Sequence, residues 1–143
     1  MPSSLLAAFV DTSAWKAYYD EEDELHVDAR KFMESMSSRD APVRLLLTSD
    51  YVLDETVTLI RFAHSHSKAV EFAKTILSSR ATRIVYLGEE NFQKTLELFN
   101  ESRDKEWSFT DCASFTVMRL LNVTRAFTFD AHFKQAGFQT LPQ

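Results

Sequence analysis

The feature that most restricts the fold of this chain is a regular alternation of short apolar runs with longer segments of helical periodicity. Apolar runs typical of buried strands occupy residues 7–10, 44–47, 83–87 and 126–129, and residues 138–141 form a candidate fifth strand. The segments between them predict helices at residues 13–19, 25–37, 50–64, 67–79, 89–103 and 110–121. Strands that are apolar throughout are typical of parallel sheets with helices on both faces. The sequence therefore predicts an α/β fold, a three-layer α/β/α sandwich around a central parallel sheet of four to five strands.

Length and composition fit one domain over residues 1–143. Hydrophobic residues make up 45% and charged residues 26%, which is ordinary for a globular domain. The two glycines, Gly88 and Gly137, are too few for a Walker loop or a G-x-G-x-x-G turn, so nucleotide binding by those motifs is excluded. The single cysteine, Cys112, excludes an intramolecular disulfide and a cysteine zinc cluster, and we expect it to be a small core residue.

The N-terminal residues lack the features of a secretion signal. The first basic residue is Lys16, and the apolar run at residues 5–10 is too short for the core of a signal peptide. No stretch approaches the 18 or so apolar residues that a membrane-spanning helix needs. With the unpaired cysteine, these features predict a cytoplasmic protein without a membrane segment.

The formal net charge of −5 comes mainly from one region. Residues 1–28 hold seven of the 21 acidic residues and one of the 16 basic residues, with an unbroken acidic run at 20–24. A nucleic-acid-binding protein is usually basic, so the overall charge does not indicate one. Nucleic-acid binding remains open if bound cations supply the positive charge at the site.

Two carboxylates come directly after predicted strands. Asp11 follows the run at 7–10, and Asp130 follows the run at 126–129. Ligands of open parallel sheets bind beyond the carboxyl ends of the strands, which makes both residues candidates for a site. Each can also serve as the N-cap of the helix after it, so the sequence leaves both roles open.

Helical periodicity separates two neighbouring acids in the segment 50–64. At about 100° per residue, one apolar arc of this helix contains Val52, Leu53, Val57, Leu59, Ile60, Phe62 and Ala63. Glu55 falls inside that arc, whereas Asp54 falls on the opposite, polar side. An inward glutamate without a basic residue on its arc is costly to ionise unless a cation meets it. We therefore predict that Glu55, and not Asp54, faces a site.

Asp111 is another acid in apolar surroundings. Its helix, 110–121, is apolar almost all round, and Asp111 projects between Phe115 and Met118. An acid in the first turn also complements the helix dipole, so a capping role is an equal alternative. Taken together, four acids at one sheet edge without a matching basic cluster suit the hard cations Mg²⁺ or Mn²⁺. Such sites support phosphodiester hydrolysis by activating water.

Four segments also resemble, in order, the successive motifs of a known family. They are FVDTS at 9–13, TSDYVLDE at 48–55, SFTDC at 108–112 and TFDAHF at 128–133. This ordered set resembles the PIN-domain nucleases, and in particular the small VapC-type toxins of prokaryotic toxin–antitoxin modules. The resemblance covers essentially the whole chain and implies a single PIN-like domain over residues 1–143.

The resemblance also implies roles for individual residues. Four acids would coordinate the metal and carry catalysis: Asp11, Glu55, Asp111 and Asp130. Three hydroxyl residues would support them: Thr12, Ser13 and Thr110. Ser13 departs from the family pattern, because many members carry Asn there.

The implied function is a divalent-metal-dependent endoribonuclease with Mg²⁺ or Mn²⁺ as cofactor, RNA as substrate, a protein antitoxin as partner and a homodimeric assembly. The alternative is a catalytically weak or inactive PIN-like module that binds protein or RNA. A response-regulator receiver is a third reading, since it is also a parallel α/β domain with an acidic pocket. It is disfavoured because it needs a second acid beside the first strand-end aspartate, and Val10 and Thr12 flank Asp11.

Other residues give weaker signals. His64 and His66 lie two positions apart on a helix and so do not face one another as a metal pair. His132 lies close to Asp130 and is a candidate phosphate contact. Trp15, Tyr18 and Tyr19, with Phe32, Met33 and Met36, belong either to the core or to an apolar groove for a partner segment.

Overall fold

The computed structural model describes residues 6–143, with a five-stranded sheet at their centre. The strands are β1 (Ala7–Val10), β2 (Leu45–Ser49), β3 (Thr82–Val85), β4 (Arg125–Phe127) and β5 (Gln139–Leu141). Their order is β3-β2-β1-β4-β5, and every neighbouring pair is parallel. The predicted parallel sheet is confirmed, with the candidate fifth strand as one of its edges.

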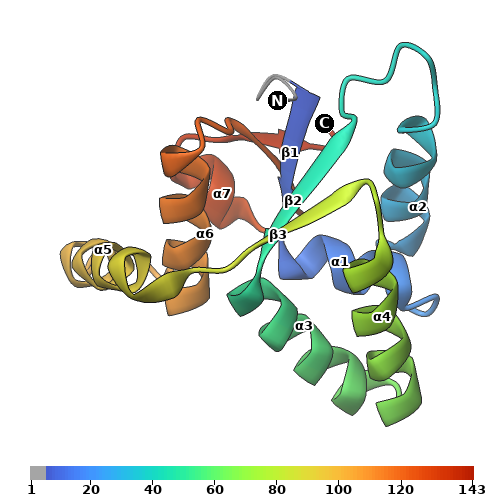
Figure 1. Cartoon of the computed structure of the whole chain (residues 1–143), viewed down its shortest axis with the longest axis horizontal. Helices are drawn as coiled ribbons and strands as arrows, with labels where there is room; N and C mark the ends of the chain where they lie inside the picture. Colours follow the sequence, from blue (N-terminus) through green and yellow to red (C-terminus); the bar gives the residue numbers. More distant parts are fainter. Residues whose placement is uncertain (1–5) are drawn as a thin grey trace.

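Seven helices connect the strands within the described residues. They are α1 (Thr12–Tyr19), α2 (His26–Ser35), α3 (Asp50–Ala63), α4 (His66–Ser78), α5 (Gly88–Glu101), α6 (Phe109–Leu120) and α7 (Ala131–Gln135). Figure 1 shows α1 to α4 on one side of the sheet and α5 to α7 on the other, which confirms the three layers. The chain runs outward from β1 to β2 and β3, then crosses back to β4 and β5, and right-handed crossovers in opposite directions place helices on opposite faces. No helix in residues 6–143 is both long enough and apolar enough to cross a membrane.

Short-range hydrogen bonds determine where several helices begin. The side chains of Asp11, Ser49, Ser65, Ser108 and Asp130 each accept a hydrogen bond from a backbone N–H in the first turn of the helix that follows. Such caps satisfy N–H groups that the helix itself leaves unpaired. Because capping depends on residues two or three positions apart, the sequence predicts the starts of these five helices to within one residue.

Strand β2 extends further than predicted, to Ser49, because Thr48 and Ser49 continue the pairing with β3. Both are polar but fully buried. The Thr48 hydroxyl donates to the Val10 carbonyl and lies 3.2 Å from the Trp15 Nε1, whose hydrogen bond it accepts. These bonds compensate for burying the hydroxyl and tie β2 to β1 at the edge where the site lies.

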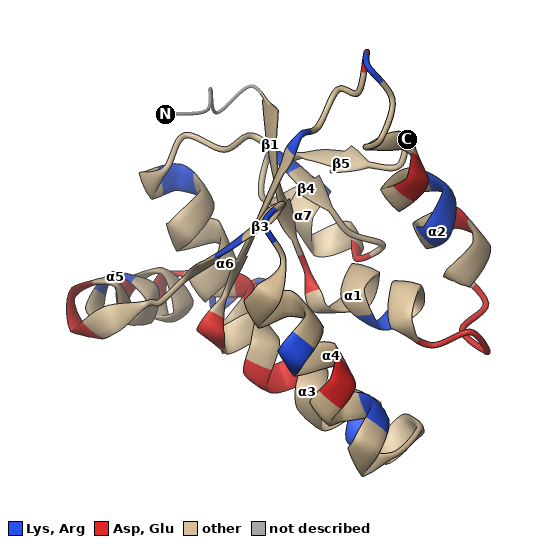
Figure 2. Cartoon of the chain, turned by 45° about the vertical axis from the view of Figure 1, so that its right-hand side comes forward, with Lys and Arg blue, Asp and Glu red and all other residues tan. Residues whose placement is uncertain are grey.

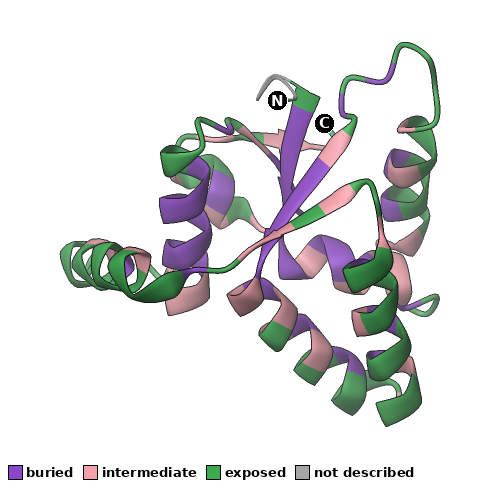
Figure 3. Ribbon diagram, in the orientation of Figure 1, coloured by how far each residue is buried: buried purple, intermediate pink, exposed green. Residues whose placement is uncertain are grey.

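Aromatic rings form much of the core. The largest fully buried side chains include Trp15, Phe9, Phe72, Phe115, Phe127 and Phe133. Figure 3 shows buried residues concentrated in β1, in β2 and on the inner faces of α1 and α6. Cys112 is buried as predicted, and burial raises the pKa of its thiol to about 11.

The aromatic residues of α1 belong to the core rather than to an apolar groove. Trp15 is buried, and Tyr18 and Tyr19 pack half-buried against the core. The cavity beside these two tyrosines is lined otherwise by polar and charged side chains, namely Glu21, His26, Arg30, Glu34 and Lys68. This cavity is therefore polar, unlike the apolar groove considered from the sequence.

Helix α3 buries less of its apolar arc than the sequence predicts. Val52, Thr56 and Ile60 form its buried row, whereas Leu59 is 41% exposed and Phe62 is 80% exposed. Helix α3 packs against α1 and α4, and its C-terminal half projects away from the sheet in Figure 1. The apolar arc is therefore not buried along its whole length: Leu59 lines the cavity described below, and Phe62 lies exposed near the projecting end of the helix.

Candidate metal centre

One cavity at the carboxyl end of the sheet brings together the four acids singled out in the sequence. Asp11 follows β1, Asp130 lies between β4 and α7, Asp111 is in the first turn of α6, and Glu55 is on α3. All four line a cavity of about 540 Å³, called the acidic cavity below. The other lining residues are Thr12, Ser13, Lys16, Asp23, Glu24, Leu25, Leu59, Glu106, Ser108 and His132.

Asp11 is the most deeply buried of the four acids, with 4% of its surface exposed. Its Oδ2 accepts hydrogen bonds from Ser13 Oγ at 2.9 Å and from Thr128 Oγ1 at 3.0 Å. The pKa of Asp11 is raised to about 6, chiefly by burial and further by the charge of Asp111, although the two hydroxyl bonds act to lower it. A cation next to Asp11 would offset the cost of ionising it.

The Ser13 and Thr128 hydroxyls join the ends of β1 and β4. Their oxygens lie 3.2 Å apart, Ser13 Oγ accepts the Phe129 N–H, and Thr128 Oγ1 accepts the Asp130 N–H. Strand β4 ends at Phe127, two residues earlier than predicted: the Thr128 N–H still bonds to the Leu141 carbonyl of β5, but the N–H groups of Phe129 and Asp130 bond to side chains. The segment that carries Asp130 is thereby held against the start of α1.

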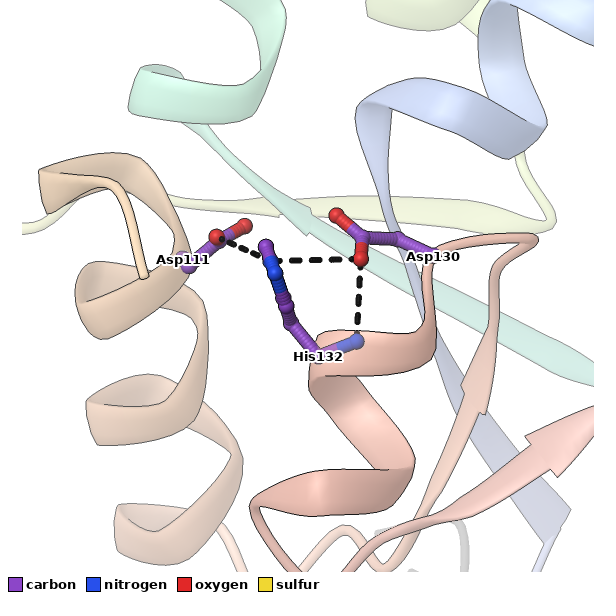
Figure 4. Close-up of side chains that lie close together, drawn as sticks. All are labelled: Asp111, Asp130 and His132. Carbon is purple, nitrogen blue, oxygen red and sulfur yellow. Dashed lines mark hydrogen bonds and ion pairs between the residues drawn. The ribbon is translucent and has the colours of Figure 1, made fainter. Parts of the chain in front are cut away.

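His132 lies between Asp111 and Asp130, as Figure 4 shows. Its Nδ1 is 3.1 Å from Asp111 Oδ2 and 3.2 Å from Asp130 Oδ1. The His132 backbone N–H also donates to Asp130 Oδ1, at 2.9 Å. Each of these three side chains offers one ligand atom, and the three atoms all lie within 4.8 Å of one another. They could therefore share one metal ion.

Asp111 is a capping residue and a cavity residue at once. The Ser108 Oγ accepts the Asp111 N–H, while Asp111 Oδ2 accepts the Ser108 N–H, each at 3.0 Å, which is a reciprocal capping box at the start of α6. The same Asp111 Oδ2 lies against His132. The two roles left open by the sequence are compatible, because the cap fixes the carboxylate in the lining of the acidic cavity.

Glu55 and Asp54 lie on different sides of α3. Glu55 is half-buried and lines the acidic cavity, whereas Asp54 is exposed and outside that lining. Within residues 6–143, no ion pair or hydrogen bond engages the Glu55 carboxylate. Its oxygens are available to a cation in the cavity.

The three predicted supporting hydroxyls occupy different positions. Thr12 and Ser13 line the acidic cavity, but Thr110 does not; the hydroxyl residue of that segment in the lining is Ser108. Thr12 is 5% exposed, and within the described chain its Oγ1 is buried without a hydrogen-bond partner. Buried hydroxyls are nearly always hydrogen-bonded, so this oxygen points to a ligand that completes the site.

The acidic cavity carries a strong excess of negative charge. Seven Asp or Glu residues line it against one lysine, and this Lys16 is already paired with Asp20 and Asp23, at 3.1 Å each. Figure 2 shows the acidic loop between α1 and α2 as a continuous red segment that follows α1. Uncompensated carboxylates and an unpartnered hydroxyl are a suitable donor set for Mg²⁺ or Mn²⁺, so the residues present fit a divalent cation.

Sequence reasoning missed Thr128 and gave His132 only a minor role. Both lie two positions from Asp130, inside the motif 128–133, which is the one local signal that could have identified them. Their decisive contacts are long-range: Thr128 reaches Asp11 across 117 positions, and His132 reaches Asp111 across 21. Only the folded structure determines these contacts.

Comparison with known proteins agrees with this architecture. Residues 8–139 match the PIN domain family. The chain is 35% identical over 130 residues to the 23S rRNA-specific endonuclease VapC20 of Mycobacterium tuberculosis. This alignment covers 91% of this chain and 94% of the relative. It is 26% identical over 129 residues to a VapC ribonuclease of Archaeoglobus fulgidus, covering 90% of this chain and 80% of the relative.

A solved structure gives the same result in three dimensions. The crystal structure of Mycobacterium tuberculosis VapC20, described as a sarcin–ricin loop cleaving toxin, matches with a TM-score of 0.83 and 32% identity. The match covers 92% of this chain and 95% of that chain. The chain therefore shares its fold with a solved VapC toxin, and it belongs to the PIN domain family as a homologue of the VapC toxins.

Proposed function

We propose that this chain is a divalent-metal-dependent endoribonuclease that hydrolyses RNA phosphodiester bonds and acts as the toxin of a toxin–antitoxin pair. One observation carries the proposal: Asp11, Glu55, Asp111 and Asp130, from four separate segments, line one cavity whose own residues do not balance its negative charge. Homology to VapC ribonucleases over nine-tenths of the chain supports the same activity.

The four carboxylates would hold Mg²⁺ or Mn²⁺, with the Thr12 hydroxyl as a further oxygen beside them. When bound, such a cation supplies a Lewis acid that activates water and neutralises charge on the phosphodiester. The chain's own residues keep the ligands in place: Ser13 and Thr128 hold the Asp11 carboxylate, and the capping box holds Asp111. Ligands fixed in advance reduce the cost of assembling the charged site.

Substrate binding should also depend on the cation. RNA is a polyanion, and the carboxylates of the acidic cavity repel its phosphates until a cation reduces their charge. Lys16 is the one Lys or Arg in the cavity lining, and Asp20 and Asp23 already neutralise it. We therefore expect divalent metal to be required for RNA binding at this site as well as for cleavage.

The partners proposed for the chain follow from its relatives. Because the relative VapC20 is named as 23S rRNA-specific, ribosomal RNA is the substrate class to test first. The inhibitor would be a protein antitoxin. Assembly as a homodimer remains a prediction, to be tested by light scattering of the purified chain.

The experiment is a cleavage assay with a 23S rRNA fragment that contains the sarcin–ricin loop, and with tRNA for comparison, in Mg²⁺, Mn²⁺ or EDTA. Internal cleavage that needs metal and disappears in the Asp11→Asn variant would support the proposal. RNA binding by the wild type without cleavage in either metal would instead favour the interaction module considered from the sequence.

A further inference from the structure

The four-carboxylate scheme leaves the position of the His132 imidazole unexplained. We infer that His132 is a nitrogen ligand of the metal, together with Asp111 and Asp130, and that this nitrogen makes the site prefer Mn²⁺ to Mg²⁺. The inference rests on the proposed function, because it concerns the identity of the cation in the same acidic cavity.

The distances around His132 are those of neighbouring ligand atoms. Its Nδ1 lies 3.1 Å from Asp111 Oδ2 and 3.2 Å from Asp130 Oδ1. In an octahedral site with metal–ligand bonds of about 2.1 Å, adjacent ligand atoms are about 3 Å apart. One ligand atom from each of the three side chains lies within 4.8 Å of the other two, a spacing that allows them to share one ion.

The ring is also held in this position from two elements. Asp111 stands at the start of α6 and is fixed there by its capping box. On the other side, the Asp130 carboxylate caps α7 by accepting the His132 N–H, which anchors the backbone that carries the ring. Both carboxylates are therefore positioned by bonds other than those to the imidazole. Metal binding through Nδ1 would require this nitrogen to be unprotonated, with the ring proton on Nε2 instead.

A second observation in the same cavity points to a missing ligand. The Thr12 Oγ1 is buried, lies in the lining of the acidic cavity, and has no partner within the described residues. Contacts among His132, Asp111 and Asp130 do not account for it. A cation with its water shell would supply the partner that this hydroxyl lacks.

The identity of the third ligand atom decides which cation is preferred. Mg²⁺ favours carboxylate, carbonyl and water oxygens, whereas imidazole nitrogen is a ligand of first-row transition ions. Mn²⁺ accepts both kinds of donor and lies at the weak end of that series. A site with two carboxylates and one imidazole therefore gains affinity for Mn²⁺ and little for Mg²⁺.

The rival explanation makes His132 a substitute for the cation. In that case the protonated ring would bridge the two carboxylates in the metal-free protein, and the metal would displace it. The two explanations predict opposite results when the imidazole is removed. A ligand that is lost weakens metal binding, whereas a competitor that is lost strengthens it.

The experiment measures Mn²⁺ and Mg²⁺ binding to the full chain by calorimetry, without RNA, at about pH 8, where a free imidazole is neutral. The proteins are the wild type, His132→Phe, His132→Asn and the control His66→Phe, which alters an exposed histidine at the start of α4. Pulsed electron paramagnetic resonance of bound Mn²⁺ tests directly for nitrogen coupling. Circular dichroism checks that each variant is folded.

We expect the wild type to bind Mn²⁺ more tightly than Mg²⁺ and to show nitrogen coupling. His132→Phe should lose about tenfold or more in Mn²⁺ affinity, lose the coupling, and change its Mg²⁺ affinity much less. His132→Asn should lose the nitrogen coupling and show a smaller preference for Mn²⁺ over Mg²⁺, because an amide oxygen replaces the imidazole nitrogen. His66→Phe should behave as the wild type.

Three results would overturn the inference: wild-type Mn²⁺ without nitrogen coupling, tighter Mn²⁺ binding by His132→Phe, or equal losses for both ions. None of them affects the proposed ribonuclease if the wild type still cleaves RNA in Mg²⁺ and Asp11→Asn does not. Conversely, nitrogen coupling without RNA cleavage would refute the nuclease and leave the ligand assignment standing.

Discussion

At the scale of single residues, Asp11 illustrates what it costs to assemble this site. Its ordinary pKa is 3.8, and in the fold it is raised to about 6, mainly because the carboxyl is buried. A raised pKa means that the folded state favours the protonated form. This contribution to stability is fully present below about pH 4 and is lost as pH rises through 6, and the difference amounts to about 3 kcal/mol.

The corresponding test compares wild type and Asp11→Asn in EDTA by urea denaturation from pH 4 to pH 7. The variant lacks the titrating group. The difference in free energy of unfolding, variant minus wild type, should therefore increase by up to about 3 kcal/mol as pH rises across this range. Using the difference between the two proteins removes the pH dependence of the other acids. A difference that stays constant with pH would mean that the Asp11 pKa is not raised.

The neighbouring pair Asp54 and Glu55 provides a matched test of the cavity. Glu55→Gln should greatly reduce metal-dependent cleavage, because it removes a carboxylate that lines the acidic cavity. Asp54→Asn should leave cleavage nearly unchanged, because this side chain is exposed outside the cavity. Both variants remove one negative charge from the same helix. Equal losses would therefore argue against a specific role for Glu55.

Thr128 is expected to act by positioning Asp11. Its hydroxyl donates to Asp11 Oδ2 and accepts the Asp130 N–H, so it joins two of the four acids. Thr128→Val should raise the pKa of Asp11 further, because a hydrogen bond to the charged form is lost, and should lower cleavage. Thr128→Ser should restore both. The measurement is the Asp11 pKa, determined by NMR titration in EDTA. A pKa that is the same in Thr128→Val and in the wild type would refute this role.

At the scale of elements, the start of α6 serves stability and the site through the same bonds. Ser108→Ala removes the cap of α6 and should cost about 1 kcal/mol in urea denaturation. Ser65→Ala removes the cap of α4, away from the acidic cavity, and should cost a similar amount. Only Ser108→Ala should also weaken Mn²⁺ binding, since it frees Asp111. Unchanged metal affinity in Ser108→Ala would show that the cap does not position the carboxylate.

At the scale of the whole molecule, the four acids meet only because both halves of the fold contribute to one sheet edge. Asp11 and Glu55 come from the half containing β1 to β3, and Asp111 and Asp130 from the half containing β4 and β5. An unfolded chain does not bring these ligands together, so metal binds the folded state and stabilises it.

Thermal unfolding measures this link between metal and fold. At a metal concentration 100 times the dissociation constant, the stabilisation should be about 2.7 kcal/mol. Asp11→Asn should raise the melting temperature in EDTA at neutral pH, because a buried charge is removed, and should shrink the increase caused by Mn²⁺. A wild type whose melting temperature is the same with and without metal would contradict metal binding by these acids.

The sequence by itself determined the features that depend on near neighbours. The alternation of strands and helices follows from periodicity within each segment, and the helix starts follow from capping side chains such as Ser49 and Ser65. The same local periodicity placed Glu55 towards the cavity and Asp54 towards solvent. The positions of the four candidate acids along the chain suggested that all four meet at one sheet edge, and the family resemblance then implied that they coordinate a metal.

Only the tertiary structure decided what depends on residues far apart in the chain. It placed His132 between Asp111 and Asp130, linked Thr128 to Asp11, and left Phe62 exposed at the projecting end of α3. Periodicity and capping involve energies of residues within a few positions of one another. Which side chain fills the space beside a carboxylate depends instead on how the layers pack, and that is settled only when the whole chain folds.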